Sequence, residues 1–360
     1  MKITGIILVV LGVLLGILGL VAPVIGASVA VGKVNSTDST TYSTAKVKYL
    51  NQEKLIAAVT ANDPNAAYDT VNLESTRVTK AESGNADAEK QGASIFNTVS
   101  VNKLAGTDTV FTASPGGEAI FAFNPSDSQL INCCGAGTRA IDPATGQPTG
   151  DWNTNIDFQG VMPLKFPFAS PQDTLQVYNG DLQAPVETKF AGEVEQYGMK
   201  LYKYTQSIPP TQLPGKPLLE VPMSLAKVAV GVFAPAQAPL LDSLPQDQNV
   251  ALYRFTSQEN TFLVEPLSGQ IVDGQLTNKD TARLNNGDVD ILTVAELEGQ
   301  SANVEEGAAE IKSSADLLAL VGIATPILIG LGVILLIIGI ILLVMASRKK
   351  KAAASAAASS

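Results

Sequence analysis

The sequence has no histidine and only two cysteines among its 360 residues. The absence of histidine excludes Ser-His-Asp and Cys-His nucleophiles and His-ligated zinc. Charged residues are also scarce, at 16%, and acidic residues outnumber basic ones by 34 to 24. Because phosphate backbones attract basic surfaces, the net charge of −10 argues against nucleic acid as a partner. The hydrophobic content of 46% excludes a disordered chain.

Two long uncharged runs are present, over residues 3–32 and 317–347. Each is long enough to cross the hydrocarbon layer of roughly 30 Å as a helix. The first run also has features of a signal peptide, because Lys2 precedes it and small residues at 28–30 resemble a cleavage site. Its apolar part is longer than that of a signal sequence. We therefore predict an uncleaved transmembrane anchor over residues 1–32 and a C-terminal transmembrane helix over residues 317–347.

The orientation follows from the basic residues 348–351, which come directly after the second run. The positive-inside rule assigns this end to the cytoplasm, and the tail over residues 348–360 with it. Two spans then return the N-terminus to the cytoplasm. The residues in between hold 19 basic and 34 acidic side chains, and we expect them on the outer side of the plasma membrane.

One face of the first run carries small residues that allow close helix packing. They are Gly5, Gly12, Gly16 and Gly19. Gly332 and Gly339 in the second run offer a partner within the chain, and a helix of another chain is the alternative. A third interpretation is that glycine is simply frequent in membrane helices.

The middle of the chain, residues 33–295, predicts a mainly β (α+β) domain of repeated hairpins, because apolar and polar residues alternate in many short segments. We expect a short helix over Leu50–Ala61 and a helical stalk over residues 296–316. The predicted strands are Ala45–Leu50, Val71–Thr79, Ser94–Val101, Thr109–Ala113, Glu118–Phe123, Val186–Glu195, Lys200–Gln206, Ala251–Ser257 and Thr261–Val264.

Internal similarities support the hairpins. Residues 201–207, LYKYTQS, recur as LYRFTSQ at 252–258. Three segments share an Asx or Glu residue, a proline and a final glutamine: residues 124–129, 142–147 and 265–270. An Asx side chain that bonds to the backbone, together with proline, favours a tight reversal. We predict a turn at each.

The two cysteines, Cys133 and Cys134, are adjacent. A disulfide between them, a free pair and intermolecular bridges are the alternatives, because an oxidising compartment disfavours free thiols. A structural role is favoured over redox chemistry, since no Cys-x-x-Cys spacing or basic neighbour lowers a thiol pKa.

Residues 221–241 contain one charged residue, Lys227, and three prolines. They predict either a core helix near residues 224–232 or a mobile flap over a cavity that receives a lipid chain. The phenylalanines of residues 164–168 present the same choice between core and ligand contact. The candidate lipid-binding residues are Phe166, Phe168, Val228, Val230, Val232 and Phe233.

Several segments occur in an order that resembles a known family. Between the two anchors they are residues 132–135, 164–168, 197–204 and 264–272. Over nearly the whole chain this order resembles the actinobacterial envelope family commonly labelled the porin PorA family. The resemblance implies an accessory role in the envelope of mycolic-acid-bearing actinobacteria, in lipoglycan maturation or mycolate glycolipid trafficking beside a lipid transporter. The porin label conflicts with two predicted helical spans, because a pore needs a lipid-facing barrel.

We therefore predict a non-enzymatic accessory protein that handles or presents a membrane lipid or glycolipid at the outer face of the plasma membrane. The alternative is a scaffolding protein whose membrane helices bind an envelope transporter or synthase. An enzyme with paired carboxylates is a third hypothesis, but nothing fixes two of them at a useful separation. The aspartates considered are Asp142, Asp151, Asp157, Asp173 and Asp181. No catalytic residue, metal site or cofactor is predicted.

Overall fold

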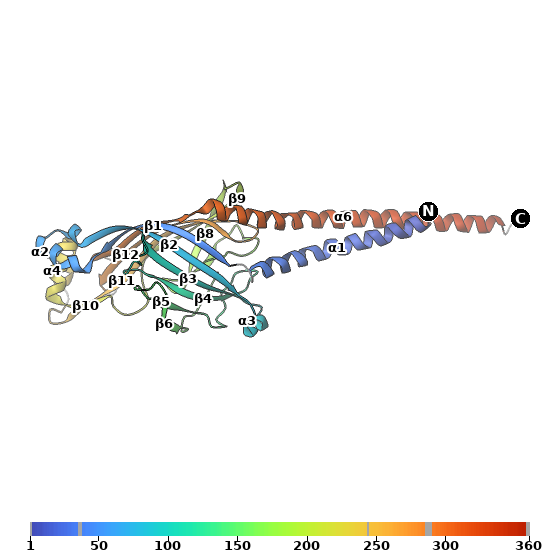
Figure 1. Ribbon diagram of the computed structural model, residues 1–360. Coiled ribbons are helices and arrows are strands. Elements are labelled where there is room, and N and C mark those ends of the chain that lie inside the picture. Colours follow the sequence, from blue (N-terminus) through green and yellow to red (C-terminus); the bar gives the residue numbers. More distant parts are fainter. Residues whose placement is uncertain (1, 35–37, 243–244, 285–289, 358–360) are drawn as a thin grey trace. The chain divides into compact units, whose positions relative to one another are not determined.

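The fold is described from a computed structural model of the chain (Figure 1). It covers all residues except 1, 35–37, 243–244, 285–289 and 358–360, and the side chains at 2, 5, 23–25, 27, 33, 240 and 349–357 are not described either. The chain divides into two compact units. Residues 1–33 and 313–360 form the first unit, which we call the helix pair, and residues 34–312 form the second, the β unit.

The helix pair consists of α1 (Lys2–Val34) and the greater part of α6 (Val304–Ala357). Within the described residues, the segment Val304–Arg348 is long and apolar enough to cross a membrane. The described apolar segment of α1, Ile6–Ala22, is shorter. The C-terminal span is thus supported by length and composition, and the N-terminal span stays a prediction.

The β unit is built on a 13-stranded sheet in which neighbouring strands are antiparallel. The order is β6-β5-β4-β3-β2-β1-β13-β12-β11-β9-β8-β7, with β10 paired to β11. The strands are β1 (Ser39–Leu50), β2 (Tyr68–Glu82), β3 (Ser94–Leu104), β4 (Gly116–Phe123), β5 (Gly137–Ile141), β6 (Pro148–Asn153), β7 (Leu175–Asn179), β8 (Ala184–Gln196), β9 (Met199–Gln212), β10 (Leu219–Pro222), β11 (Asn249–Val264), β12 (Ile271–Leu284) and β13 (Leu292–Ala302). The predicted mainly β class is confirmed.

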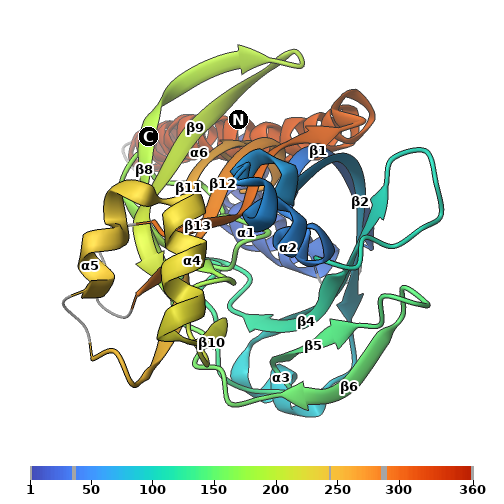
Figure 2. The same cartoon turned by 90° about the vertical axis from the view of Figure 1, so that its left-hand side faces the viewer.

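Short helices fill the connections between strands. They are α2 (Gln52–Ala61), α3 (Ala86–Gln91), α4 (Met223–Phe233) and α5 (Ala238–Asp242), with 3-10 turns η1 (Pro64–Ala67) and η2 (Pro235–Gln237). The predicted helix over Leu50–Ala61 is confirmed as α2. It begins where the side chain of Asn51 accepts a hydrogen bond from the N–H of Glu53, and it ends at Asn62 in the left-handed conformation. Figure 2 views the β unit from the end that carries α2 and α4.

Three sequence predictions need correction. Residues 109–113 do not form a strand, because Val110 alone bridges to Lys103. The two strands predicted at 251–257 and 261–264 are one strand, β11. The polar residues between them pair on both sides, with β9 and β12, so they continue the strand instead of turning.

The helical stalk over residues 296–316 is also wrong in its first part. Residues 296–302 belong to β13, which pairs with β1 and β12, and α6 begins only at Val304. Alanine and glutamate favoured a helix here by local propensity, but pairing on both sides overrides so weak a preference. The β unit therefore extends to residue 312, beyond the predicted boundary at 295.

The sheet curls so far that strands distant in its order meet. The rings of Phe121 in β4 and Tyr178 in β7 are 6.4 Å apart. Single β-bridges join Gln129 to Val161 and Val161 to Val177, which links the chain after β4 to β7. The face that carries Phe121 is therefore enclosed by the curl, and we call it the inner face.

The opposite, outer face is charged over the central strands. The register places Lys46 beside Glu298 and Lys48 beside Glu296. Lys279 Nζ on β12 lies 3.6 Å from Glu296 Oε1 on β13. A transmembrane β-barrel needs an apolar outward band. Over these central strands the outer face is therefore suited to water.

The three predicted turns share one geometry, which confirms the prediction. In each, the N–H of the first residue donates to the C=O of the sixth, and the N–H of the fifth donates to the C=O of the first, at 2.8–2.9 Å. The first side chain accepts from the N–H two residues on. The fifth residue has positive φ in all three: Ser128, Gly146 and Gly269.

Candidate functional site

The glycines of α1 pack against α6 of the same chain. A Cβ added at Gly12 would lie 2.6 Å from the carbonyl oxygen of Gly332, and one added at Gly332 would lie 2.8 Å from Gly16 N. A Cβ added at Gly19 would lie 2.6 Å from Cγ1 of Ile329 on α6. These distances require residues without side chains, since real Cβ atoms do not approach backbone so closely. Gly5 lies in α1, but its surroundings fall outside the described residues.

The outward surfaces of both helices are apolar. Their exposed side chains include Leu11, Leu14, Leu18, Ile334, Ile337 and Ile341. Such a surface is stable in hydrocarbon and costly in water. A Cβ added at Gly16 would meet nothing within 4 Å, so Gly12 and Gly19 are the predicted positions at which α6 lies too close for a side chain.

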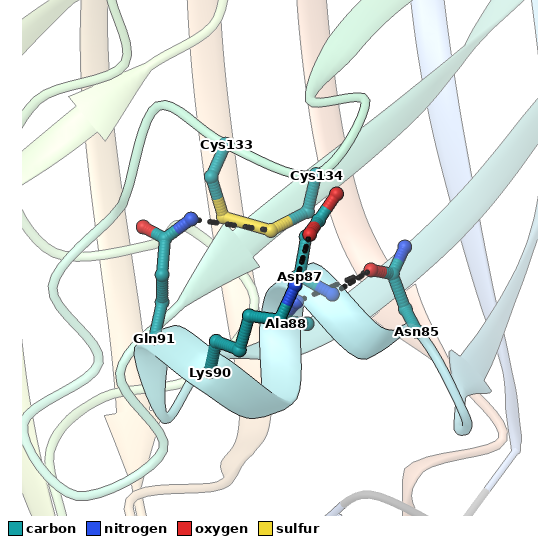
Figure 3. Close-up of a disulfide and its surroundings, with 7 residues drawn as sticks. All are labelled: Asn85, Asp87, Ala88, Lys90, Gln91, Cys133 and Cys134. Carbon is teal, nitrogen blue, oxygen red and sulfur yellow. Dashed lines mark hydrogen bonds and ion pairs between the residues drawn. A yellow bond between two sulfur atoms is a disulfide. The ribbon is translucent and has the colours of Figure 1, made fainter.

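Cys133 and Cys134 form a disulfide with each other (Figure 3). Of the three alternatives, this is the bond within the pair, and not a free pair or bridges between chains. Cys134 and the following Gly135 both have positive φ. The pair packs on a small apolar cluster that includes Ala88 of α3, and Gln91 Nε2 on the same helix lies 4.0 Å from Cys134 Sγ. The disulfide therefore fastens the 131–136 loop over α3, which is a structural role.

Replacing Cys133 with serine is expected to lower the free energy of unfolding by only about 1 kcal/mol, because a disulfide that closes so short a loop removes little chain entropy. Chemical denaturation of the full chain in detergent, followed by circular dichroism, measures the loss. Adding a reductant to the wild type should give the same loss. A loss several times larger would mean that the disulfide holds more of the fold than its loop.

The residues predicted to contact lipid do not line one common cavity. Phe166 is fully buried in a core cluster with Tyr204 and Val264. Phe168 is partly buried, and Lys165 Nζ lies 3.9 Å from the centre of its ring. Both phenylalanines therefore pack against neighbouring side chains. Of the two interpretations of residues 164–168, core and ligand contact, the structure agrees with the core.

The other four predicted residues lie on α4, where the predicted core helix is confirmed. Val230 is buried in a cluster with Ala226 at the end of the β unit, and Val232 is partly buried. Val228 points to solvent and is 50% exposed. Phe233 alone borders a hollow.

This hollow has a volume of about 260 Å³. Phe233, Tyr68 and Leu292 contribute apolar surface to it, and Lys48 contributes an ammonium group whose Nζ lies 4.6 Å from the centre of the Tyr68 ring. The rings of Tyr68 and Phe233 meet edge to face at 6.4 Å. The hollow is slightly smaller than the roughly 300–1,000 Å³ of small-molecule sites. It is open to solvent, and its lining also includes the polar side chains of Asn65, Asp290 and Thr293.

A second candidate region is a network of amide side chains on the inner face. Gln258 on β11 is 3% exposed, and its Oε1 accepts a hydrogen bond from Asn179 Nδ2 at 2.9 Å. Gln258 Nε2 donates to Asp181 Oδ2 at 2.7 Å. Asn260 Nδ2 donates to Gln206 Oε1 on β9 at 2.8 Å. Sequence reasoning missed this network, although Gln206 and Gln258 both occur in the repeated LYKYTQS and LYRFTSQ segments.

Charged groups border this network. Asp181 and Arg254 are exposed, whereas Asp280 is 4% exposed. Arg254 Nε donates to Asp280 Oδ2 at 3.1 Å. Burial raises the pKa of the Asp181 carboxyl above its ordinary value, and the hydrogen bond from Gln258 opposes the rise.

Lys165 is buried without a carboxylate partner in hydrogen-bond contact among the described residues. Its Nζ donates to Phe166 O at 3.0 Å and to Ser128 Oγ at 3.2 Å. Burial lowers the pKa of Lys165 to about 7, and the charge of Asp127 opposes the change. The ammonium group clamps residues 164–168 to the 124–129 turn.

The free energy of unfolding is expected to rise with pH above about 7 because of this lysine. The folded state releases the Lys165 proton near pH 7, whereas the unfolded chain keeps it up to about 10.5, so the slope reaches at most about 1.4 kcal/mol per pH unit. Urea titrations between pH 6 and 9 check this. Lys165→Met should remove the rise and the exposed Lys189→Met should keep it; equal slopes in all three proteins would contradict the assignment.

The comparison with known proteins agrees with the resemblance found in the sequence. A family model described as Porin PorA matches residues 4–341. The chain belongs to this family. A relative named Porin PorA, from Corynebacterium amycolatum, is 29% identical over 161 residues, which cover 42% of this chain and 38% of the relative. The match to that relative thus spans less than half of its length, and membership suggests a membrane protein of the cell envelope.

Proposed function

We propose that this PorA-family member is a non-enzymatic accessory protein that handles or presents a lipid or glycolipid at the outer face of the plasma membrane. In this proposal α1 and α6 both span the membrane, both termini are cytoplasmic, and the β unit is displayed outside. The apolar outward surfaces of the helix pair and the basic residues 348–351 support this topology. The charged outer face of the sheet argues against a pore formed by its strands.

The observation that carries the lipid proposal is the hollow beside α4. It combines apolar walls from Phe233 and Leu292 with the ammonium group of Lys48, and amphiphiles need both kinds of contact. Each methylene group that leaves water contributes about 0.8 kcal/mol.

The hydrogen bonds of the aspartates that were considered as catalytic pairs support a non-enzymatic role. Asp142 accepts a hydrogen bond from Ala144 N within its turn, and Asp157 accepts one from Asn132 Nδ2. Asp173 accepts from the N–H of Thr174. These carboxylates hold turns and loops in place, which is a sufficient account of their positions.

Native mass spectrometry of the full-length protein, purified from an actinobacterial membrane, tests the proposal. The wild type should carry a lipid or glycolipid that Phe233→Arg loses, because the substitution places a charge in the hollow. Val228→Arg on the same helix is the matched control, since Val228 points to solvent, and it should keep the lipid. A wild type that repeatedly emerges without lipid, or a lipid retained equally by both variants, would contradict the proposal.

A further inference from the structure

The curl of the sheet is closed by two short segments that lie between β4 and β7. Gln129 forms a single bridge to Val161, and Val161 forms another to Val177 of β7. We call residues 129–132 and 157–161 together the seam. Single bridges and a few hydrogen bonds take the place of a strand ladder here. Because such contacts open more readily than a ladder does, the seam is the place where a small change in the chain can loosen the curl.

The disulfide-bonded pair begins directly after the first segment of the seam. Asn132, the last residue of that segment, accepts a hydrogen bond from Phe158 N at its Oδ1, at 2.8 Å. Its Nδ2 donates to Asp157 Oδ1 at 2.6 Å. The next residue is Cys133, whose N–H donates to Ile131 O at 2.9 Å. A movement of the Cys133 backbone therefore acts directly on the side chain that joins the two segments.

The backbone of the pair is held in a conformation that few residues adopt. Cys134 has a φ of 62°, and the following Gly135 has a φ of 84°. Glycine takes positive φ at no steric cost, whereas a residue with a Cβ does not. The bond to Cys133 constrains Cys134 covalently. When that bond is broken, Cys134 can return to a more favourable backbone conformation, and the loop that begins at Ile131 can move with it.

The disulfide is accessible, and it contributes little to the stability of the whole chain. It links neighbouring residues, so it removes little entropy from the unfolded state. Cys133 and Cys134 are both partly exposed, and Asn132 and Gly135 on either side of them are exposed. Exposed disulfides are the ones that thiols reduce most readily. A change of oxidation state should therefore alter the loop and the seam, and leave the fold intact.

We propose that Cys133 and Cys134 form a reversible redox site that controls the seam. The reductant is a dithiol. One of its thiolates attacks Cys133 Sγ, Cys134 Sγ leaves as a thiolate, and the second thiol of the reductant then displaces Cys133. The reductant ends as a disulfide, and the protein gains two electrons and two protons as a pair of thiols. Gln91 Nε2, 4.0 Å from Cys134 Sγ, is placed to donate to the departing thiolate (Figure 3). This site is independent of the lipid proposal.

Hydrogen exchange of the full-length protein in detergent, read by mass spectrometry with and without dithiothreitol, tests the proposal. Alkylation by iodoacetamide under the same native conditions reports the oxidation state. We expect dithiothreitol to make both cysteines reactive and to raise the exchange rate of peptides from the seam about fivefold. Peptides from β11 and β12 should exchange as before, and the β signal in circular dichroism should be unchanged.

The double variant Cys133→Ser with Cys134→Ser is the matched control. Its seam should exchange like that of the reduced wild type, and dithiothreitol should have no further effect. Three results would overturn the proposal: cysteines that stay unreactive until the protein is denatured, a seam that exchanges equally in the oxidised and reduced wild type, and a double variant that responds to dithiothreitol as the wild type does.

Discussion

Replacing Gly269 with alanine is expected to destabilise the β unit by more than about 3 kcal/mol. Gly269 has a φ of 72°, and an added Cβ would lie 2.0 Å from Phe166 O and 2.5 Å from Pro167 O. Relief of this clash would break the hydrogen bond from Phe166 N to Gly269 O, which is 2.7 Å long. It would also shift Phe166, a fully buried side chain. Urea denaturation of the full chain in detergent, followed by the β signal in circular dichroism, measures the loss.

Gly146→Ala is the matched control, because Gly146 holds the equivalent position in another of the three turns. Its φ is 68°, but the nearest atom to an added Cβ is a side-chain carbon of Val110 at 3.2 Å. In both variants alanine must adopt the left-handed backbone conformation, which costs about 1 kcal/mol. Only Gly269 adds a backbone clash. Similar losses in the two variants would show that the 265–270 turn is not packed on residues 164–168 as described.

Replacing Gly12 with leucine is expected to separate α1 from α6. The side chain would occupy the place of the Gly332 carbonyl and of Leu336 N, 2.6 and 2.8 Å from the added Cβ. A cross-link reports the separation: a Cβ at Gly26 would lie 3.7 Å from Val321 Cβ, within the roughly 3.5–4.5 Å of a disulfide. The double variant Gly26→Cys with Val321→Cys should therefore oxidise readily, and Gly12→Leu in that background should abolish the cross-link.

Gly330→Leu serves as the control for this experiment. It lies on α6 near Gly332, but nothing lies within 4 Å of an added Cβ there, so the cross-link should form as in the parent. If Gly12→Leu cross-links as well as Gly330→Leu, the helices do not pack through their glycines. If the parent double variant fails to cross-link, the pairing of α1 with α6 is itself wrong.

The features predicted well from the sequence are those with a local physical cause. The three turns depend on an Asx or Glu side chain, a proline and a residue that tolerates positive φ, all within six positions. The longer strands alternate apolar and polar residues, as in β9 and β11. The glycine face of α1 follows from helical periodicity alone, although its partner became clear only when Gly332 was seen against Gly12 and Gly16.

The features missed depend on contacts between distant segments. β13 has residues that favour a helix, and its pairing with β1, far away in the chain, makes it a strand. The inner-face network joins Asn179 to Gln258 across 79 positions. No local pattern indicates that the two amides meet. The choice of Phe166 and Val230 as lipid contacts failed for the same reason, because apolar residues of two separate cores look alike in sequence.

The central claim is that the chain enters and leaves the membrane from the cytoplasm and displays the β unit outside. Labelling of single introduced cysteines in intact cells with an impermeant maleimide tests it most directly, since the native cysteines are held in a disulfide. Asp108→Cys on a fully exposed loop should label in intact cells, and Ser355→Cys in the tail should label only after permeabilisation. Protection of Asp108→Cys in intact cells, or labelling of Ser355→Cys without permeabilisation, would contradict the account.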